Sequence, residues 1–290
     1  MASTLRIGID ASGGDFGTNV TIPATIEASK NPNIQIVVYG SVKEIGEQLQ
    51  DHPIEYKDCR HPNQELRLAF DDLSSGFLQA VVTACNSRNL MVVAAHHRLP
   101  GVKKPGLLAS IPTALRTSYI IDVGATARED DPEVYLGWGQ MACNHFGTSS
   151  LWIGLQNIAA ERAFPELMKV HLFLQQKLPN YRGFIEPADF FAGKVDIMLS
   201  DGFLGNTDLK MLEAAAAFFF SKAYQSLEAI PQAVQTLDLL KTESLSYDAH
   251  LICQLLGVKG KIYRIHGNAS VEQFAKGINL AAKRHLPASI

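Results

Sequence analysis

The chain has 290 residues, a formal net charge of −3, 47% hydrophobic residues and 19% charged residues. This length is enough for one large α/β domain, or for two smaller lobes, with a full hydrophobic core. The slightly acidic balance and the lack of a long basic run argue against nucleic acid as the main partner. The four cysteines lie far apart, without a CxxC motif or a Cys/His cluster, so nothing indicates a zinc site, and their even number does not by itself imply disulfides.

The first ten residues, MASTLRIGID, run directly into an expected strand and lack the apolar core of a signal peptide. No later stretch is long and apolar enough to span a membrane. We therefore expect a reduced, cytoplasmic protein.

Short apolar runs that end in glycine or small polar residues alternate with helix-like segments along the chain. In the first half we expect strands at residues 5–10, 34–39, 54–61, 81–84, 107–111 and 118–123. The helices expected there are one up to residue 29 with Pro23 in its first turn, then 42–50, 64–80 with an interruption, 90–97, and 132–144 with Pro132 in its first turn.

The second half continues the alternation. Strands are expected at residues 151–155, 182–185, 195–199 and 261–265, and helices at 163–177, 188–192, 208–227, 232–241, 247–255 and 271–285. This pattern predicts a mostly parallel sheet wrapped by helices on both faces.

One segment, Val195–Glu213 (VDIMLSDGFLGNTDLKMLE), organises the rest of the chain. It predicts a buried strand, a sharp turn with two glycines, and a helix that begins at Thr207 or Asp208. This order places backbone N–H groups and the positive end of a helix at the carboxyl end of a strand, which favours an anion and above all phosphate. An ordinary strand–helix turn that binds no ligand would have the same sequence pattern.

Four other strand ends carry similar turns, and parallel sheets bind ligands outside the carboxyl ends of their strands. The five ends are Asp10–Asp15, Thr83–Ser87, Asp122–Ala125, Asp201–Asn206 and His266–Asn268. The first of these turns carries glycines, but not at the GxGxxG spacing of a dinucleotide site. A dehydrogenase is therefore disfavoured.

These strand ends resemble the PlsX-type phosphate acyltransferases, which convert acyl-carrier-protein thioesters to acyl phosphates for phospholipid synthesis. The resemblance rests on IGIDASGGDFGTNVTIPATIEA, IIDVGAT, YRGFIEPADFFAGKVDIMLSDGFLGNTDLKMLEA and YDAHLICQLLGVKGKIYRIHGNAS. The third segment is the best and most specific match. The similarity extends from Leu5 to about His285, with a gap in the first half, in a chain shorter than most members of that family.

The resemblance implies a three-layer α/β/α Rossmann-like sandwich of the isocitrate and isopropylmalate dehydrogenase type. It implies a single domain over residues 1–290, with a helical projection at residues 208–245. It also implies a homodimer without cofactor or metal, acting on acyl carrier protein and inorganic phosphate, and loosely attached to the inner face of the membrane.

For this chemistry we expect His266, Asp201 and Lys210 to be catalytic. The expected phosphate- or substrate-binding residues are Asp10, Gly13, Gly14, Asp15, Asn86, Asp122, Gly124, Gly202, Gly205, Asn206 and Gly267. Backbone N–H groups of the glycines would hold phosphate against the thioester and stabilise the developing oxyanion. His266 would pair with phosphate as imidazolium, or take its proton as imidazole.

Each assignment has a plainer alternative. The aspartates would repel phosphate, and they are better explained as caps that accept backbone N–H groups of turns. Alternatively, one of them could act as a base, or all of them could orient lysine and arginine. Asn206 could cap the following helix, Lys210 could lie on a solvated helix face, and His266 could satisfy backbone groups at a strand end.

The chain also departs from the family. The family turn S-A-G-N-T-G corresponds to Thr83–Arg88, where Cys85 and Arg88 replace both glycines, and Ala159 replaces another glycine. Arg88 would either contact phosphate or block the acyl channel. These departures favour an alternative function, that of a non-catalytic relative acting as a binding or regulatory protein.

Aromatic residues gather on the helix after the central turn, at Phe218, Phe219, Phe220 and Tyr224. Consecutive phenylalanines cover more than one face, which is typical of a buried helix. We expect burial at a dimer contact, with a weakly membrane-touching tip near Leu227–Leu240.

Overall fold

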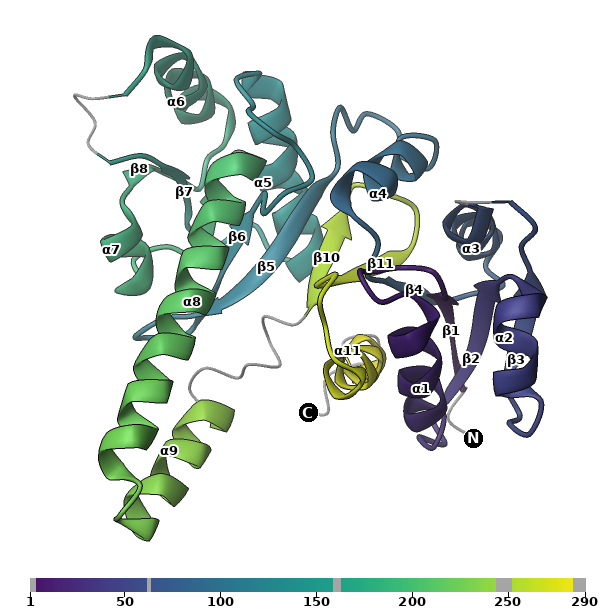
Figure 1. Ribbon diagram of the computed structural model, residues 1–290. Coiled ribbons are helices and arrows are strands. Elements are labelled where there is room, and N and C mark those ends of the chain that lie inside the picture. Colours follow the sequence, from purple (N-terminus) through teal and green to yellow (C-terminus); the bar gives the residue numbers. More distant parts are fainter. Residues whose placement is uncertain (1–3, 62–63, 159–162, 244–251, 284–290) are drawn as a thin grey trace. The chain divides into compact units, whose positions relative to one another are not determined.

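The computed structural model describes residues 4–61, 64–158, 163–243 and 252–283 (Figure 1). The chain divides into two compact units, of which the first comprises Met1–Gly101 and Leu251–Ile290 and the second comprises Val102–His250. The prediction of a single domain over residues 1–290 stays a prediction.

The strands described in the first unit follow the order β3-β2-β1-β4-β11-β10. Their bounds are β1 Leu5–Asp10, β2 Ile34–Gly40, β3 Glu55–Asp58, β4 Ala80–Thr83, β10 Ile252–Leu256 and β11 Lys261–Ile265. All neighbouring pairs are parallel except β10 and β11. Because β1, β4 and β11 run in the same direction, their carboxyl ends meet at one edge of the sheet.

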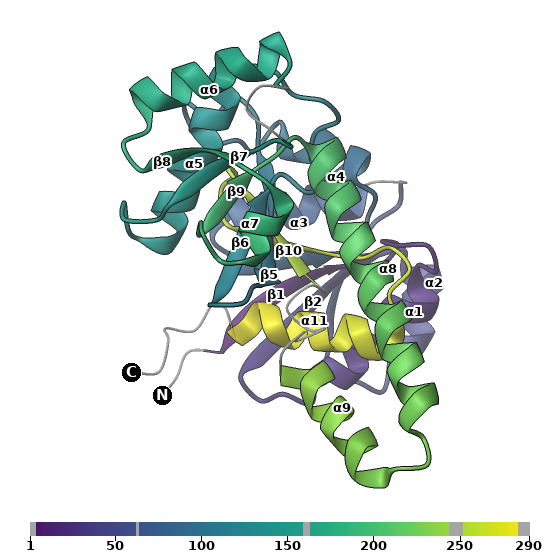
Figure 2. The ribbon, with the colours of Figure 1, turned by 90° about the vertical axis from the view of Figure 1, so that its left-hand side faces the viewer.

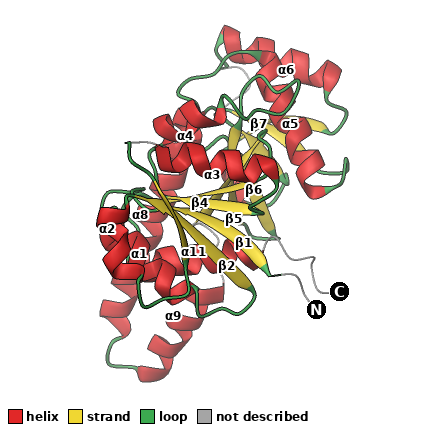
Figure 3. Ribbon diagram, turned by 90° about the vertical axis from the view of Figure 1, so that its right-hand side faces the viewer, coloured by secondary structure: helices red, strands yellow, loops and turns green. Residues whose placement is uncertain are grey.

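Helices cover both faces of this sheet (Figure 3). The helices are α1 Thr18–Ala28, α2 Val42–Leu49, α3 Gln64–Ser75, α4 Ser87–Ala94 and α11 Val271–Lys283. On one face, Ile7 and Ile9 of β1 share a buried core with Ile22 of α1 and Phe274 of α11. On the opposite face, alternation along β2 turns Tyr39 toward α3.

The strands described in the second unit follow the order β5-β6-β9-β7-β8. They are β5 Gly106–Pro112, β6 Thr117–Ile121, β7 Ile153–Gln156, β8 Tyr181–Ile185 and β9 Ile197–Leu199, and the helices are α5 Pro132–Phe146, α6 Pro165–Lys177, α7 Pro187–Phe191, α8 Gly202–Leu227 and α9 Pro231–Glu243. Among the described strands of this unit only β5 and β6 pair antiparallel, so β6, β9 and β7 end at a common edge. The predicted α/β class with a mostly parallel sheet is confirmed.

Helix α8 extends well past the sheet of the second unit, and α9 folds back beside its far half (Figure 2). The hydroxyl of Tyr224 donates to Asp238 over 2.6 Å and ties the two helices together. The side chains of Phe218 and Phe219 are 57% and 68% exposed, so the predicted burial of this cluster does not occur within the chain itself. A dimer contact over them stays a prediction. Nowhere in the described part of the chain is a helix both long and apolar enough to cross a bilayer.

Among the predicted elements that differ from the structure, three bear on the site or the topology. Residues 252–255 form strand β10 rather than a helix, because a short apolar run has no periodicity that separates the two; the rest of that expected helix, residues 247–251, lies outside the described residues. Helix α1 begins at Thr18, which places Pro23 inside it rather than in its first turn. Helix α8 begins at Gly202, five residues before Thr207, because Asp201 caps it directly after β9.

Candidate functional site

In the first unit, the ends of β1 and β4 are joined through Asp10 and Thr83. The hydroxyl of Thr83 donates to Asp10 Oδ2 over 2.8 Å and accepts the backbone N–H of Cys85 over 3.0 Å. Asp10 is only 3% exposed. Burial raises the pKa of its carboxyl to about 6, with a smaller lowering by the Thr83 hydrogen bond. This carboxyl can therefore gain or lose a proton close to neutral pH.

The turn after β1 lies against the ends of β4 and β11. A Cβ atom added at Gly13 would come within 2.8 Å of Asp10 Oδ2 and 3.2 Å of the Cys85 backbone nitrogen, so only glycine allows this approach. Gly14 has φ near +90°, and Asp15 donates its backbone N–H to Gly267 O over 2.7 Å. The structure thus brings together Asp10, Gly13, Gly14, Asp15 and Gly267, as the sequence predicted.

Arg264 on β11 and His266 directly after β11 belong to the same edge of the sheet. Arg264 donates from Nε to the backbone oxygen of Cys85 over 3.1 Å, which fixes its guanidinium at the end of β4. His266 follows β11 directly and is half-buried. The sequence analysis did not select Arg264, because its position opposite Thr83 depends on the register of β11 and β4. Burial raises the pKa of the neighbouring Cys85 thiol to about 12, which keeps it protonated and argues against a nucleophilic role.

Asn86 and Arg88 lie at the start of α4. Asn86 is exposed and caps the helix, because its side-chain oxygen accepts the backbone N–H of Asn89 over 2.9 Å. Arg88 is exposed in the first turn of the same helix. Capping explains Asn86 without a ligand, and its substrate-binding role stays a prediction.

In the second unit, Asp122 follows β6 and is completely buried. Its Oδ1 accepts the backbone N–H groups of Leu107, Gly124 and Ala125 at 2.8–3.1 Å. Its Oδ2 accepts the backbone N–H of Thr126 over 2.7 Å and the hydroxyl of Thr126 over 3.0 Å. Burial raises the pKa of Asp122, while these hydrogen bonds oppose the shift. The geometry is that of a turn cap, which is the plainer of the two readings of this residue.

The backbone N–H groups at the start of α8 are already engaged within the protein. Gly202 donates to the Thr126 hydroxyl over 3.1 Å, Phe203 to Ala127 O over 3.0 Å, and Leu204 to Asp201 Oδ1 over 2.7 Å. Gly205 donates to the backbone oxygen of Asp201 over 2.9 Å. The N–H groups of Gly202 and Gly205 are thus engaged by Thr126 of the loop after β6 and by Asp201, and their phosphate-binding role stays a prediction.

The two glycines instead allow α8 to lie against that loop. A Cβ atom at Gly202 would stand 2.1 Å from Thr126 O, and one at Gly205 would stand 2.0 Å from Asp122 O. Both contacts are shorter than any real packing allows, so close approach, and not turn formation, accounts for the glycines.

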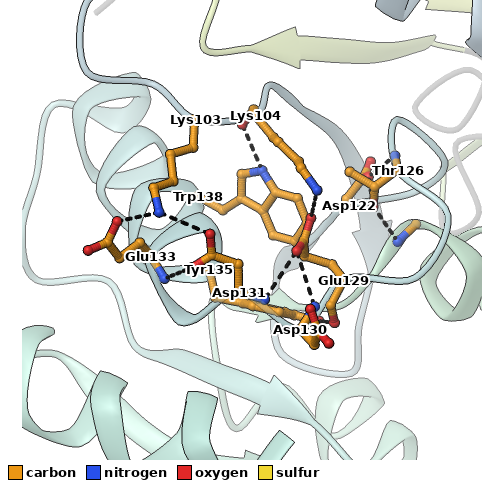
Figure 4. A network of polar contacts seen from close by, with 11 residues as sticks. Lys103, Lys104, Asp122, Thr126, Glu129, Asp130, Asp131, Glu133, Tyr135 and Trp138 are labelled. Carbon is orange, nitrogen blue, oxygen red and sulfur yellow. Dashed lines mark hydrogen bonds and ion pairs between the residues drawn. The ribbon is translucent and has the colours of Figure 1, made fainter. Parts of the chain in front are cut away.

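The same loop is held at its far end by Glu129, which lies in a network of polar contacts (Figure 4). The side chain of Glu129 is 3% exposed and accepts a 2.6 Å hydrogen bond from Lys104 Nζ. Its other oxygen accepts the backbone N–H groups of Asp130 and Asp131, each over 3.1 Å. Trp138 of α5 donates to the backbone oxygen of Lys104 over 3.1 Å. Two buried carboxylates, Asp122 and Glu129, thus fix the two ends of the loop that carries the start of α8.

Three further candidates lie in the second unit. The side chain of Asn206 is close to Gly124, at which an added Cβ would meet Asn206 Cγ at 3.6 Å. Lys210 is 60% exposed at its side chain and lies 3.8 Å from Glu213, which matches the solvated alternative. Asp201 caps α8. Catalytic roles for Asp201 and Lys210 stay predictions.

Comparison with known proteins places the chain in a family. A family model described as "Fatty acid synthesis protein" matches residues 54–285. A phosphate acyltransferase of Photobacterium profundum is 30% identical over 99% of this chain and 95% of its own length. The chain belongs to the PlsX-type phosphate acyltransferase family. The resemblance indicated by the sequence is thereby confirmed.

Other members of the phosphate acyltransferase family are similarly related. The phosphate acyltransferase of Shewanella pealeana is 28% identical over 99% of this chain and 96% of its own length. The alignment with the Photobacterium relative extends over 325 positions, whereas this chain has 290 residues, so at least 35 positions have no counterpart here. The chain is thus a shortened member of the family.

Solved structures of the same fold are more distant in sequence. The EutD phosphotransacetylase of Staphylococcus aureus is 10% identical, with a TM-score of 0.57. The match covers 98% of this chain and 96% of that protein. A branched-chain phosphotransacylase of Enterococcus faecalis is 14% identical with a TM-score of 0.58, covering 97% of this chain and 98% of its own. These likenesses establish the fold of the family member described here.

Proposed function

We propose that this protein is a phosphate acyltransferase, which makes acyl phosphate from an acyl-carrier-protein thioester and inorganic phosphate in phospholipid synthesis. The observation that carries the proposal is the near full-length similarity to relatives named phosphate acyltransferase. The cluster around Asp10 in the first unit supplies groups suited to this chemistry.

Phosphate is best accommodated at the turn after β1. Within the described residues, the backbone N–H groups of Gly13 and Gly14 have no hydrogen-bond acceptor in the protein. The guanidinium of Arg264, near the end of β11, and the ring of His266, directly after β11, can donate hydrogen bonds to a phosphate. We therefore assign the phosphate to this turn and not to the start of α8.

The reaction joins a phosphate oxygen to the thioester carbonyl carbon. A C–O bond forms, the C–S bond breaks, and the carrier leaves as thiolate. Fixed backbone donors can hold the anion and stabilise the developing oxyanion. Asp10, with its pKa near 6, can accept a proton from monobasic phosphate and leave the dianion as the stronger nucleophile.

Assembly and location complete the proposal. The exposed Phe218 and Phe219 on α8 suit burial in a homodimer, and the far end of the α8–α9 hairpin suits a weak contact with the bilayer. Acyl carrier protein is the proposed macromolecular partner. The protein would then work in the cytoplasm, peripheral to the inner face of the membrane.

A direct assay tests the proposal. Purified protein is incubated with acyl-carrier-protein thioesters of several chain lengths and inorganic phosphate. Acyl phosphate is trapped as hydroxamate, and the released carrier thiol is counted. We expect equal amounts of both products and saturation by phosphate. No product at any chain length would contradict the proposal.

The same assay addresses the non-catalytic alternative through the altered turn after β4. In that case the natural chain binds thioester without turnover, and the double variant Cys85→Gly, Arg88→Gly gains activity. Activity in the natural chain, unchanged or lowered by the double variant, excludes this alternative.

A further inference from the structure

Gln156, the last residue of β7, is a polar side chain that the proposed chemistry does not use. It is only 8% exposed, and its Nε2 donates to Asp208 Oδ2 on α8 over 2.5 Å. Within the described residues its Oε1 is buried and has no hydrogen-bond partner. Oε1 of Gln156 is therefore a buried acceptor without a donor among the described residues, next to the half-buried carboxyl of Asp208.

A buried oxygen without a hydrogen-bond partner is unusual in a folded protein. Nearly all buried polar groups in folded proteins are hydrogen-bonded, and one without a partner destabilises the fold. The rest of β7, Ile153–Leu155, is apolar and buried, so a leucine at position 156 would suit this strand. The unmet oxygen thus indicates a binding role rather than a packing role.

The orientation of the amide follows from Asp208. An ionised carboxylate can only accept hydrogen bonds, so it selects the orientation in which Nε2 faces it. Oε1 is then left to accept a hydrogen bond from another group. Burial raises the pKa of Asp208, while the hydrogen bond from Gln156 opposes this shift.

The location also suits a ligand. Strand β7 pairs in parallel with β9, so Gln156 lies at the carboxyl edge of the second sheet together with Asp201. Ligands of parallel α/β sheets bind at this edge. Asp208 lies on α8, whose start the loop after β6 fixes, so both acceptors are carried by rigid elements.

We propose that Gln156 and Asp208 form a subsite that accepts a hydrogen bond from a donor group of the thioester substrate. The donor is either a hydroxyl on the acyl chain or an amide N–H of the carrier arm, which share this chemistry. The inference rests on the proposed function and deepens it, because it names a determinant of substrate choice.

Two pairs of substrates distinguish the two donors. The first pair is a 3-hydroxyacyl thioester and the plain acyl thioester of equal length on the same carrier. The second pair is a thioester of a thiol that carries an amide and one of an alkyl thiol that lacks it. For at least one pair, we expect the natural protein to prefer the donor-bearing member by about 10-fold or more in kcat/KM.

Gln156→Leu should remove the preference by slowing only the donor-bearing member. The substitution removes the buried oxygen without a partner but also the hydrogen bond to Asp208, so these two effects oppose each other and we expect little change in the melting temperature. Gln175→Leu, at an exposed glutamine of α6, is the matched control and should leave both ratios unchanged. Asp208→Asn gives a second variant, in which the carboxylate is lost at nearly constant shape.

The outcomes separate this inference from the function on which it rests. Equal ratios in natural protein and Gln156→Leu, in both pairs, overturn the subsite but leave the acyltransferase proposal intact. Without turnover of any thioester, the acyltransferase proposal fails, and calorimetric binding of stable thioether analogues decides on the subsite. The subsite is then supported only if the natural protein binds the donor-bearing analogue about 10-fold more tightly and Gln156→Leu loses this preference. Equal affinities of the natural protein for both analogues overturn the subsite.

Discussion

The hydroxyl of Thr126 accepts the backbone N–H of Gly202 over 3.1 Å and donates to Asp122 Oδ2 over 3.0 Å. One hydroxyl group thereby connects the carboxylate that shapes the loop after β6 with the first residue of α8. The first backbone N–H groups of α8, which the sequence pattern associates with phosphate, therefore donate to acceptors of the protein itself.

Thr126→Val should test this connection. The valine has the same shape but leaves the Gly202 N–H and one bond to Asp122 unmet, so we expect a loss of about 2 kcal/mol in the free energy of unfolding. Thr126→Ser keeps the hydroxyl and should cost less than about 1 kcal/mol. Urea unfolding measures both values, and equal stability of the two variants would contradict the connection.

Gly202→Ala and Gly205→Ala should each destabilise the protein by about 3 kcal/mol or more, because the new methyl group meets a backbone oxygen at 2.1 or 2.0 Å. Gly137→Ala in helix α5 is the matched control, since nothing lies within 4 Å of its added Cβ. It should stabilise the protein by about 0.5–1 kcal/mol. Thermal unfolding distinguishes them, and similar effects at all three positions would refute the close-approach explanation.

Asp10 should make stability depend on pH. Its folded pKa of about 6 lies above the ordinary 3.8, so the folded protein keeps a proton that the unfolded chain has released. This contribution is complete below pH 3.8 and is lost by pH 6, a total of about 3 kcal/mol. Asp10→Asn does not titrate, so its stability relative to the natural protein should rise between pH 4 and pH 7. A constant difference in urea unfolding across this range would speak against the raised pKa.

Glu129→Ala should cost about 3 kcal/mol of unfolding free energy, since it leaves two backbone N–H groups and Lys104 without their shared partner. Glu133→Ala is the control, because that side chain is 58% exposed in its pair with Lys103. We expect it to change stability by less than about 1 kcal/mol. Chemical denaturation of both variants checks the difference, which should be absent if Glu129 is not a loop anchor.

Arg264→Gln should raise the KM for phosphate about 10-fold or more, because the loss of a charged donor weakens a phosphate contact. Arg264→Lys should recover part of this loss. Arg182→Gln is a control at a guanidinium that stacks on Trp152 of the second unit, 4.7 Å from the ring centroid, and should leave the KM unchanged. If Arg264→Gln changes kcat/KM for thioester but not the KM for phosphate, our placement of phosphate is incorrect.

The order of strands and helices was predictable because apolar runs of strand length alternate with helical segments nearly throughout the chain. The residues around Asp10 were predictable for the same reason, since parallel strands that end together bring their turns together. Residues 252–255 were not, because their apolar run fits a buried helix as well as the strand that antiparallel pairing with β11 makes.

The start of α8 shows what sequence alone cannot give. Glycines after a strand fit an anion site and a tight backbone contact equally well, and only the positions of Thr126 and Asp122 decide between them. Arg264 was overlooked for a related reason: its importance depends on the register that sets it opposite Thr83, which is a property of the folded sheet.

Helix α8 has 26 residues, and the buried ones are Gly202, Gly205 and Leu209, all in its first turns. At 1.5 Å per residue, Phe218 lies about 24 Å farther along the helix than Gly202. Within the described part of this unit the helix is therefore held against the sheet only at its first turns, so a small tilt there displaces the far half of α8, together with α9, by a larger distance. If the proposed dimer contact includes Phe218 and Phe219, a substitution at Thr126 should weaken that contact without touching either ring.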